Sequence, residues 1–191
     1  EHIDVVDRDS DGVSNMPDVV PKGVKYEYYE GEWTSVPSFA QLDPLKIGAS
    51  TSFTLTARLR NDHYAFRFTS CVFIPVDGVY TFYLNSDGGS RLAVHGNALV
   101  DNDGVHGLQE REGKLGLSAG RHELVLTYFA GQTNTLLNLM YEGPGFSKRP
   151  IPEDALFQRG CNPPVLATVA ATPAKSATRV TQTGLAEPAA A

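Results

Sequence analysis

The stretch from Gly78 to Gly96 constrains the fold of this chain more than any other segment of its 191 residues. It reads GVYTFYLNSDGGSRLAVHG, and Val79, Thr81 and Tyr83 alternate in it with Tyr80, Phe82 and Leu84. Successive side chains of a β-strand point to opposite faces of the sheet, so this period of two indicates a half-buried strand. Residues 85–90 are turn formers, and residues 91–94 begin a second strand. The segment therefore predicts a β-hairpin with an acidic tip.

Short apolar runs of this kind recur along the body of the chain. Gly, Pro, Asn and Asp interrupt them at spacings of about 8 to 12 residues, as they do in β-sandwiches and barrels. No window of helical length carries an apolar stripe with a period of 3.6 residues. Because 41% of the 191 residues are hydrophobic, the chain can bury one good core, yet it is too short for two large domains. We therefore expect an all-β, antiparallel fold.

Several segments resemble the PA14 domain, a β-sandwich named after anthrax protective antigen and shared by yeast adhesins and many glycosidases. The predicted hairpin is similar to the central motif of that family, and other landmarks follow in the family's order. They are residues 23–29 (GVKYEYY), 66–69 (FRFT), 74–82 (IPVDGVYTF), 100–107 (VDNDGVHG), 117–124 (LSAGRHEL), 128–129, 137–139 and 151–156. The resemblance covers residues 23–157 and implies an antiparallel sandwich that serves as an extracellular binding or assembly module.

The acidic N-terminus, residues 1–20, carries most of the net charge of −6, with six carboxylates against one arginine. Residues 7–18 (DRDSDGVSNMPD) fit the template of a calcium loop, in which alternate residues direct oxygen atoms at one centre. Without flanking helices, the loop is similar to the free-standing aspartate-rich repeats of thrombospondin type 3. The alternative is a disordered acidic tail. The expected Ca²⁺ ligands are Asp7, Asp9, Asp11, the Val13 carbonyl, Asn15 and Asp18, the last standing where glutamate is usual.

A second cation site is implied at the tip of the predicted hairpin. In the sugar-binding adhesins that the chain resembles, two adjacent aspartates at this tip hold a calcium ion that grips sugar hydroxyls. Asp87 matches the first aspartate, but Gly88 stands in place of the second. Asp101, Asn102 and Asp103 are expected to bring oxygen atoms from the neighbouring loop. Because ligand charge and number tune calcium affinity, a site with one carboxylate fewer binds the ion more weakly, and a purely structural turn is the alternative.

The two cysteines are expected to form a disulfide. Cys71 lies on a predicted strand and Cys161 lies just beyond the closing segment, so a bond between them ties the exit of the domain to its core. The alternatives are two free thiols, or an intermolecular bond through Cys161. A disulfide is consistent with an extracellular location, and a chain that starts at Glu1 without an initiator Met suits either a processed secreted protein or a fragment.

The final segment, residues 161–191, has a different composition from the body, with no aromatic residue and few charges. Such a segment builds no core of its own, which is typical of a linker. Small residues alternate along 165–171, however, which suits addition of an extended strand to the sheet edge of a neighbouring copy. Head-to-tail contacts of that type do not close and generate filaments. Candidate O-glycosylation sites are Thr168, Thr172, Ser176, Thr178, Thr181 and Thr183.

The sequence argues against several other functions. It contains no basic patch interleaved with aromatic residues, so nucleic acid is not an expected partner, and no apolar run approaches the length of a membrane span. No nucleophile, zinc or phosphate motif is present, and we expect no catalytic residues. His95 and His106 flank the loop at residues 101–103, where hydrogen bonding to backbone is a simpler role than metal binding. Trp33 is interpreted as an anchor for its loop rather than a platform for sugar.

The sequence thus predicts three parts: a calcium-loop segment (1–20), a PA14-like β-sandwich (23–157) and an extended tail or linker (161–191). The function predicted first is that of a secreted, non-catalytic subunit of a fibre or surface layer, which self-associates head to tail through the tail. The alternative is a calcium-dependent, carbohydrate-binding adhesin or an accessory module of a larger secreted protein, with glycans as partners.

Overall fold

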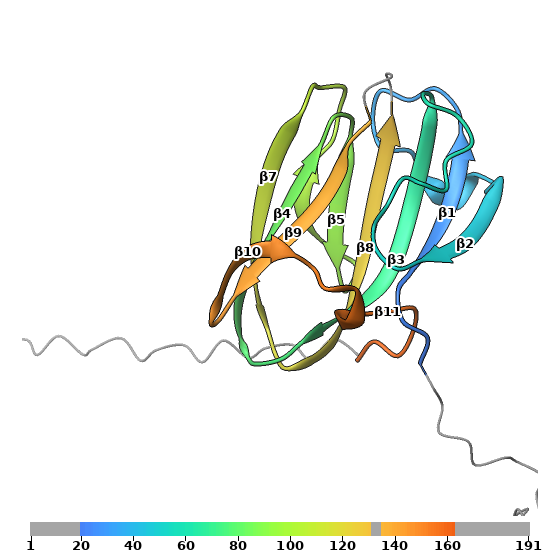
Figure 1. Ribbon diagram of the computed structural model, residues 1–191. Coiled ribbons are helices and arrows are strands. Elements are labelled where there is room, and N and C mark those ends of the chain that lie inside the picture. The colour runs from blue at the N-terminus through green and yellow to red at the C-terminus, as the bar shows by residue number, and fades with distance from the viewer. Residues whose placement is uncertain (1–19, 131–134, 163–191) are drawn as a thin grey trace, which may run out of the picture.

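Two antiparallel β-sheets pack face to face in the computed structural model, which describes residues 20–130 and 135–162 (Figure 1). The larger sheet has the strand order β2-β1-β3-β8-β5-β6, and β11 also pairs with β3. Its strands are β1 (Val24–Glu30), β2 (Lys46–Ser50), β3 (Tyr64–Ile74), β5 (Ser90–Val94), β6 (Asn97–Asn102), β8 (Gly120–Ala130) and β11 (Leu156–Phe157).

The smaller sheet has the order β10-β9-β4-β7. Its strands are β4 (Gly78–Ser86), β7 (Gln109–Leu117), β9 (Leu137–Gly143) and β10 (Phe146–Pro150). Two short 3-10 turns, η1 (Phe39–Gln41) and η2 (Glu153–Ala155), are the only helical elements in the two described ranges. The predicted all-β antiparallel sandwich is confirmed. No helix in the described part of the chain is long and apolar enough to cross a membrane.

The alternation in residues 78–86 is confirmed, but the predicted hairpin is wrong. Tyr80, Phe82 and Leu84 are fully buried between the sheets, whereas Val79 faces outward. Strand β4 pairs with β7 and β9, while β5 pairs with β6 and β8 in the opposite sheet. The turn between β4 and β5 therefore crosses from one sheet to the other. Alternation determines which face of a strand is buried, but it does not determine the strand's partner.

The core lies between the two sheets and is rich in aromatic side chains. Tyr28, Phe66 and Phe68 from the larger sheet are fully buried, as is Phe82 from the smaller one. The loop between β2 and β3 adds Phe53, whose ring packs edge-on against Phe68 with the centroids 6.0 Å apart. Burial of large apolar side chains on the inner face of each strand supplies the driving force for this arrangement.

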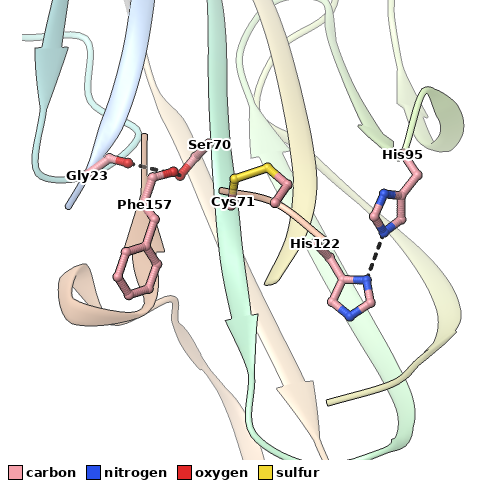
Figure 2. The surroundings of a disulfide bond; sticks show 7 residues. Gly23, Ser70, Cys71, His95, His122 and Phe157 are labelled. Carbon is pink, nitrogen blue, oxygen red and sulfur yellow. Dashed lines mark hydrogen bonds between the residues drawn. A yellow bond between two sulfur atoms is a disulfide. The ribbon is translucent and has the colours of Figure 1, made fainter. Parts of the chain in front are cut away.

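The predicted disulfide between Cys71 and Cys161 is present, with a Cα–Cα distance of 5.2 Å (Figure 2). It lies beside the short strand β11, whose Phe157 pairs with Cys71 on β3. The buried hydroxyl of Ser70 donates to the carbonyl oxygens of Gly23 and Phe157, 3.0 Å and 3.2 Å away. The chain thus enters and leaves the sandwich side by side, at one end of the molecule.

Two groups of predicted residues lie outside the described residues. The calcium loop (Asp7, Asp9, Asp11, Val13, Asn15 and Asp18) falls within 1–19, and the O-glycosylation candidates and the assembly segment fall within 163–191. All of these stay predictions.

Candidate functional site

Asp87 is the central polar residue at the end of the sandwich opposite the disulfide. It directly follows β4, whose last residue, Ser86, pairs with Gln109 on β7 and with Leu137 on β9. Its Oδ1 atom accepts hydrogen bonds from the backbone N–H of Leu136, at 2.7 Å, and from the hydroxyl of Tyr128, at 3.1 Å. Its Oδ2 atom is buried and has no hydrogen-bond partner among the described residues. The Asp87 side chain as a whole is half-buried, and its Oδ2 atom is enclosed by protein atoms.

The protonation state of Tyr128 favours the hydrogen bond from its hydroxyl to Asp87. Burial, together with the neighbouring Tyr64 and the Asp87 carboxylate, raises the pKa of the Tyr128 hydroxyl above its usual value of 10.0. The tyrosine therefore stays neutral and donates its proton to Asp87 throughout the physiological pH range.

Exposed apolar side chains flank Asp87 on both sides. Leu108 precedes β7 and Leu136 precedes β9, so the pairing of both strands with the end of β4 places them on either side of this residue. Leu108 is 63% exposed and Leu136 41% exposed, and Val105 on the preceding loop is also exposed. A carboxylate between solvent-facing apolar side chains is an arrangement suited to ligand contact, because large exposed apolar residues are costly to keep in water.

Asn102, a predicted cation ligand, bonds to residues at the turn between the sheets. It is buried, and its Nδ2 atom donates to the Ser86 hydroxyl and to the Gln109 carbonyl oxygen, each at 3.1 Å. The Ser86 hydroxyl in turn lies 2.7 Å from that of Ser90 on β5. This buried polar network connects the two sheets below Asp87, and its members satisfy one another.

Arg91 supplies the positive charge beside Asp101 and Asp103. Its guanidinium lies 3.3 Å from an Asp101 oxygen and 2.8 Å from an Asp103 oxygen. The other Asp103 oxygen accepts from the backbone N–H groups of Val36, at 2.7 Å, and Gly104, at 2.8 Å. Asp103 is thus a fixed structural residue, whereas Asp101 is largely exposed.

Asp87 bonds to Tyr128 on β8 and to Leu136 before β9, whereas Asp101 and Asp103 pair with Arg91. Within residues 20–130 and 135–162, no three His, Cys, Asp or Glu side chains are grouped to hold a metal ion.

The two glycines after Asp87 permit close packing on β8. A Cβ atom on Gly88 would lie 2.3 Å from the carbonyl oxygen of Phe129, and one on Gly89 would lie 2.1 Å from the Phe129 ring. The Phe129 N–H also donates to the Gly89 carbonyl oxygen at 2.9 Å. Gly88 thus stands where the two-aspartate pattern has its second aspartate. The backbone of this turn leaves no room for a side chain at that position.

Trp33 packs in the loop between β1 and β2, against the buried cluster of Tyr29, Ala65 and Phe129. This is the anchoring role expected from the sequence. The His106 ring lies 2.9 Å from the Asn102 carbonyl oxygen, at the same end as Asp87. His95 lies at the opposite end of β5, so the structure separates the two histidines that flank the loop in the sequence.

Comparisons with known proteins give one family match: the model described as PA14 domain matches residues 22–155. A curated relative, the anti-sigma-I factor RsgI3 of Acetivibrio thermocellus, is 27% identical over 136 residues, which are 71% of this chain and 21% of the relative. This chain thus spans about a fifth of the length of that curated protein.

Solved structures share the fold. An anti-sigma factor domain-containing protein superimposes with a TM-score of 0.63 at 23% identity, over 74% of this chain and 50% of that one. The PA14 sugar-binding domain of an RTX adhesin gives 0.58 at 17% identity, over 73% and 99%. At these identities the structural likeness establishes the fold alone.

Proposed function

The chain belongs to the PA14 domain family, and from that premise we propose that it is a non-catalytic, extracellular carbohydrate-binding module. We place its recognition surface at the Asp87 end of the sandwich. The adhesin domain described as sugar-binding, which shares this fold, supports the proposal. The disulfide supports an extracellular location, since such bonds persist in oxidising compartments.

The half-buried Asp87 carboxylate between two exposed leucines is the observation that carries the proposal. A carboxylate accepts hydrogen bonds from sugar hydroxyls, and such charge-assisted bonds are about twice as strong as neutral ones. Leu108 and Leu136 on either side offer apolar contact to the C–H face of a sugar ring. A carbohydrate presents both kinds of surface at once, which is why we favour it over a purely apolar or purely charged ligand.

The described residues at this end do not fit a calcium ion. Calcium takes six to eight oxygen ligands. Asp101 and Asp103 are paired with Arg91, Asn102 is turned inward, and Gly88 contributes no side chain. We therefore assign Asp87 a direct role as a hydrogen-bond acceptor and involve no ion in the contact.

The test is a glycan array followed by calorimetry, using the full chain in calcium and in chelator. Replacing Asp87 with Asn (Asp87→Asn) preserves shape and turns one acceptor into a donor. We expect a loss of at least about tenfold in affinity, because a hydrogen bond to a charged group contributes about 1.5–3 kcal/mol. The matched control is Asp101→Asn, at an exposed position of the same end, and it should retain affinity. Failure of the parent to bind any glycan, or unchanged binding by Asp87→Asn, would contradict the proposal.

Assembly through the C-terminal segment is the second candidate function. Its support is the fixed exit of the chain: the disulfide holds Cys161 to β3, and the Asn162 N–H donates to the Arg121 carbonyl oxygen at 2.8 Å. The sheet also ends in β2, where Leu45 and Ile47 are exposed. An edge strand with apolar side chains is a suitable acceptor for a strand from a neighbouring copy.

A further inference from the structure

Two histidines meet at the end of the sandwich opposite Asp87. His95 lies in the turn between β5 and β6, and His122 lies near the start of β8 (Figure 2). The Nε2 atom of His95 is 2.8 Å from the Nδ1 atom of His122. The two rings stand nearly perpendicular, at 73°, with their centroids 5.0 Å apart. One nitrogen atom from the β5–β6 turn and one from β8 thus face each other.

The surroundings of His122 determine which of its nitrogens carries the proton. Its Nε2 atom lies 2.8 Å from the carbonyl oxygen of Ser118, which can only accept a hydrogen bond. Nε2 is therefore protonated, and the lone pair of a neutral ring is on Nδ1, facing His95. Histidines that bind metal ions characteristically donate their other ring N–H to a carbonyl or carboxylate in this way, which fixes both tautomer and orientation.

The local backbone holds both histidines in place. His122 is only 5% exposed, within β8. His95 and Gly96 have φ values of 50° and 74°, as in the two-residue turns that close β-hairpins, and the His95 N–H donates to the Glu123 carbonyl oxygen at 3.1 Å. The His95 ring is partly exposed, so an ion has access from solvent on that side.

We propose that His95 and His122 form a binding site for a divalent transition-metal ion of the copper or nickel class, with water in the remaining positions. Two nitrogens bound at about 2.0 Å and at a right angle are about 2.8 Å apart, whereas tetrahedral ligands are about 3.3 Å apart. The observed separation of 2.8 Å matches the first geometry, which Cu²⁺ and Ni²⁺ prefer. The described residues place no third His, Cys, Asp or Glu there, so the site is open.

Binding requires one change in the pair. In the metal-free protein the His95 Nε2–H donates to His122 Nδ1. The ion replaces this hydrogen bond: the rings turn so that both lone pairs face an ion that lies beside the line joining the two nitrogens, about 2.0 Å from each. His95 then carries its proton on Nδ1, an atom that has no hydrogen-bond partner among the described residues. The neutral pair therefore releases no net proton. This site is at the opposite end from Asp87 and is independent of the proposed carbohydrate function.

The experiment is a Cu²⁺ titration of the full chain, followed by calorimetry and electron paramagnetic resonance. It is performed in a His2→Ala background, because His2 lies outside the described residues and imidazole is itself a copper ligand. The test variant is His95→Asn, and the matched control is His63→Asn. Both positions have a positive φ, 50° and 52°, that asparagine tolerates, so the two substitutions place the same demand on the backbone.

We expect one Cu²⁺ ion with two imidazole nitrogens in its spectrum, an affinity reduced at least about tenfold by His95→Asn, and no change with His63→Asn. Equal copper affinity in the parent and His95→Asn would overturn the proposal, as would a parent spectrum without two coordinated imidazoles. A nickel titration followed by NMR of the histidine rings needs no variant at His95 or His122. Selective shifts of the His95 and His122 signals support the site, and unshifted signals overturn it.

Discussion

At the scale of single residues, Gly88 allows the β4–β5 turn to pack closely against β8. Introducing a methyl group (Gly88→Ala) places a Cβ atom 2.3 Å from the Phe129 carbonyl oxygen. We expect a loss of about 1–3 kcal/mol in the free energy of unfolding, the usual cost of overpacking. Gly116→Ala on β7 is the matched control, because its Cβ meets nothing within 4 Å. Urea denaturation measures both, and equal stabilities would show that the turn has room to move.

Tyr128 offers a second test at the residue scale. Tyr128→Phe removes one of the two donors to the Asp87 carboxylate, leaving only the Leu136 N–H. We expect a destabilisation of about 1–3 kcal/mol, because a partly buried charge loses a partner. The cost should shrink in an Asp87→Asn background, where the charge is gone, so a double-mutant cycle by urea denaturation identifies the interaction. Equal costs in both backgrounds would assign the effect to packing instead.

The residue scale also shows what the sequence could and could not predict at the site. Asp87 was identified from its turn and from the family resemblance, and so was the missing second aspartate. The orientations of Asn102 and Asp103 were not predictable, because they depend on partners, Ser86 and Val36, that approach from other strands and loops. The contact between His95 and His122 spans 27 residues of sequence, and no local pattern signals it.

At the scale of elements, strand positions were largely predictable and pairing was not. The alternation in residues 78–86 correctly identified β4 and its buried face. The hairpin prediction was wrong because a turn of Asp and Gly residues suits a crossing between sheets as well as a tight return within one sheet. The chain forms the crossing here because Ser86 and Ser90 are buried in a shared polar network between the sheets.

The disulfide attaches Cys161, which follows β11, to Cys71 on β3. Replacing both cysteines with serine removes a link across 90 residues of sequence. The chain-entropy model gives an upper figure of about 4–5 kcal/mol, and measured losses are commonly about 2–5 kcal/mol. We expect a decrease within that range in urea denaturation of the Cys71→Ser, Cys161→Ser variant. Reduction of the parent with dithiothreitol should produce a similar decrease, and a stability unchanged by both treatments would contradict the prediction.

The predicted calcium loop is a second element to test. Calorimetry of the full chain should show one Ca²⁺ ion with a dissociation constant of about 10⁻⁴–10⁻³ M, the range of extracellular modules. Asp9→Asn removes one ligand charge from the loop and should weaken this binding at least about tenfold, since charge count tunes affinity. Asp101→Asn, which lies outside the loop, should not affect it. A parent that binds no calcium would refute the loop.

At the scale of the whole molecule, the sandwich separates its two candidate activities. The Asp87 surface is at one end, and the chain leaves from the other, where Cys161 is bonded to β3. Carbohydrate binding and assembly are therefore separable by deletion. Removing residues 163–191 should dissolve any filaments or oligomers of the parent while leaving glycan affinity unchanged, because the Asp87 surface is built from β4, β7 and β9.

Electron microscopy and light scattering measure the assembly, and the glycan array measures binding on the same samples. A variant with residues 163–191 scrambled keeps the length and composition of the segment but loses its alternation. If strand addition drives assembly, the scrambled chain should behave like the deletion, because the side chains on each face of an added strand are set by the period of two. Polymers that survive the deletion of residues 163–191 would show that the contact between copies lies within the sandwich. If the unmodified chain is a monomer, assembly is contradicted and carbohydrate binding is the function to test.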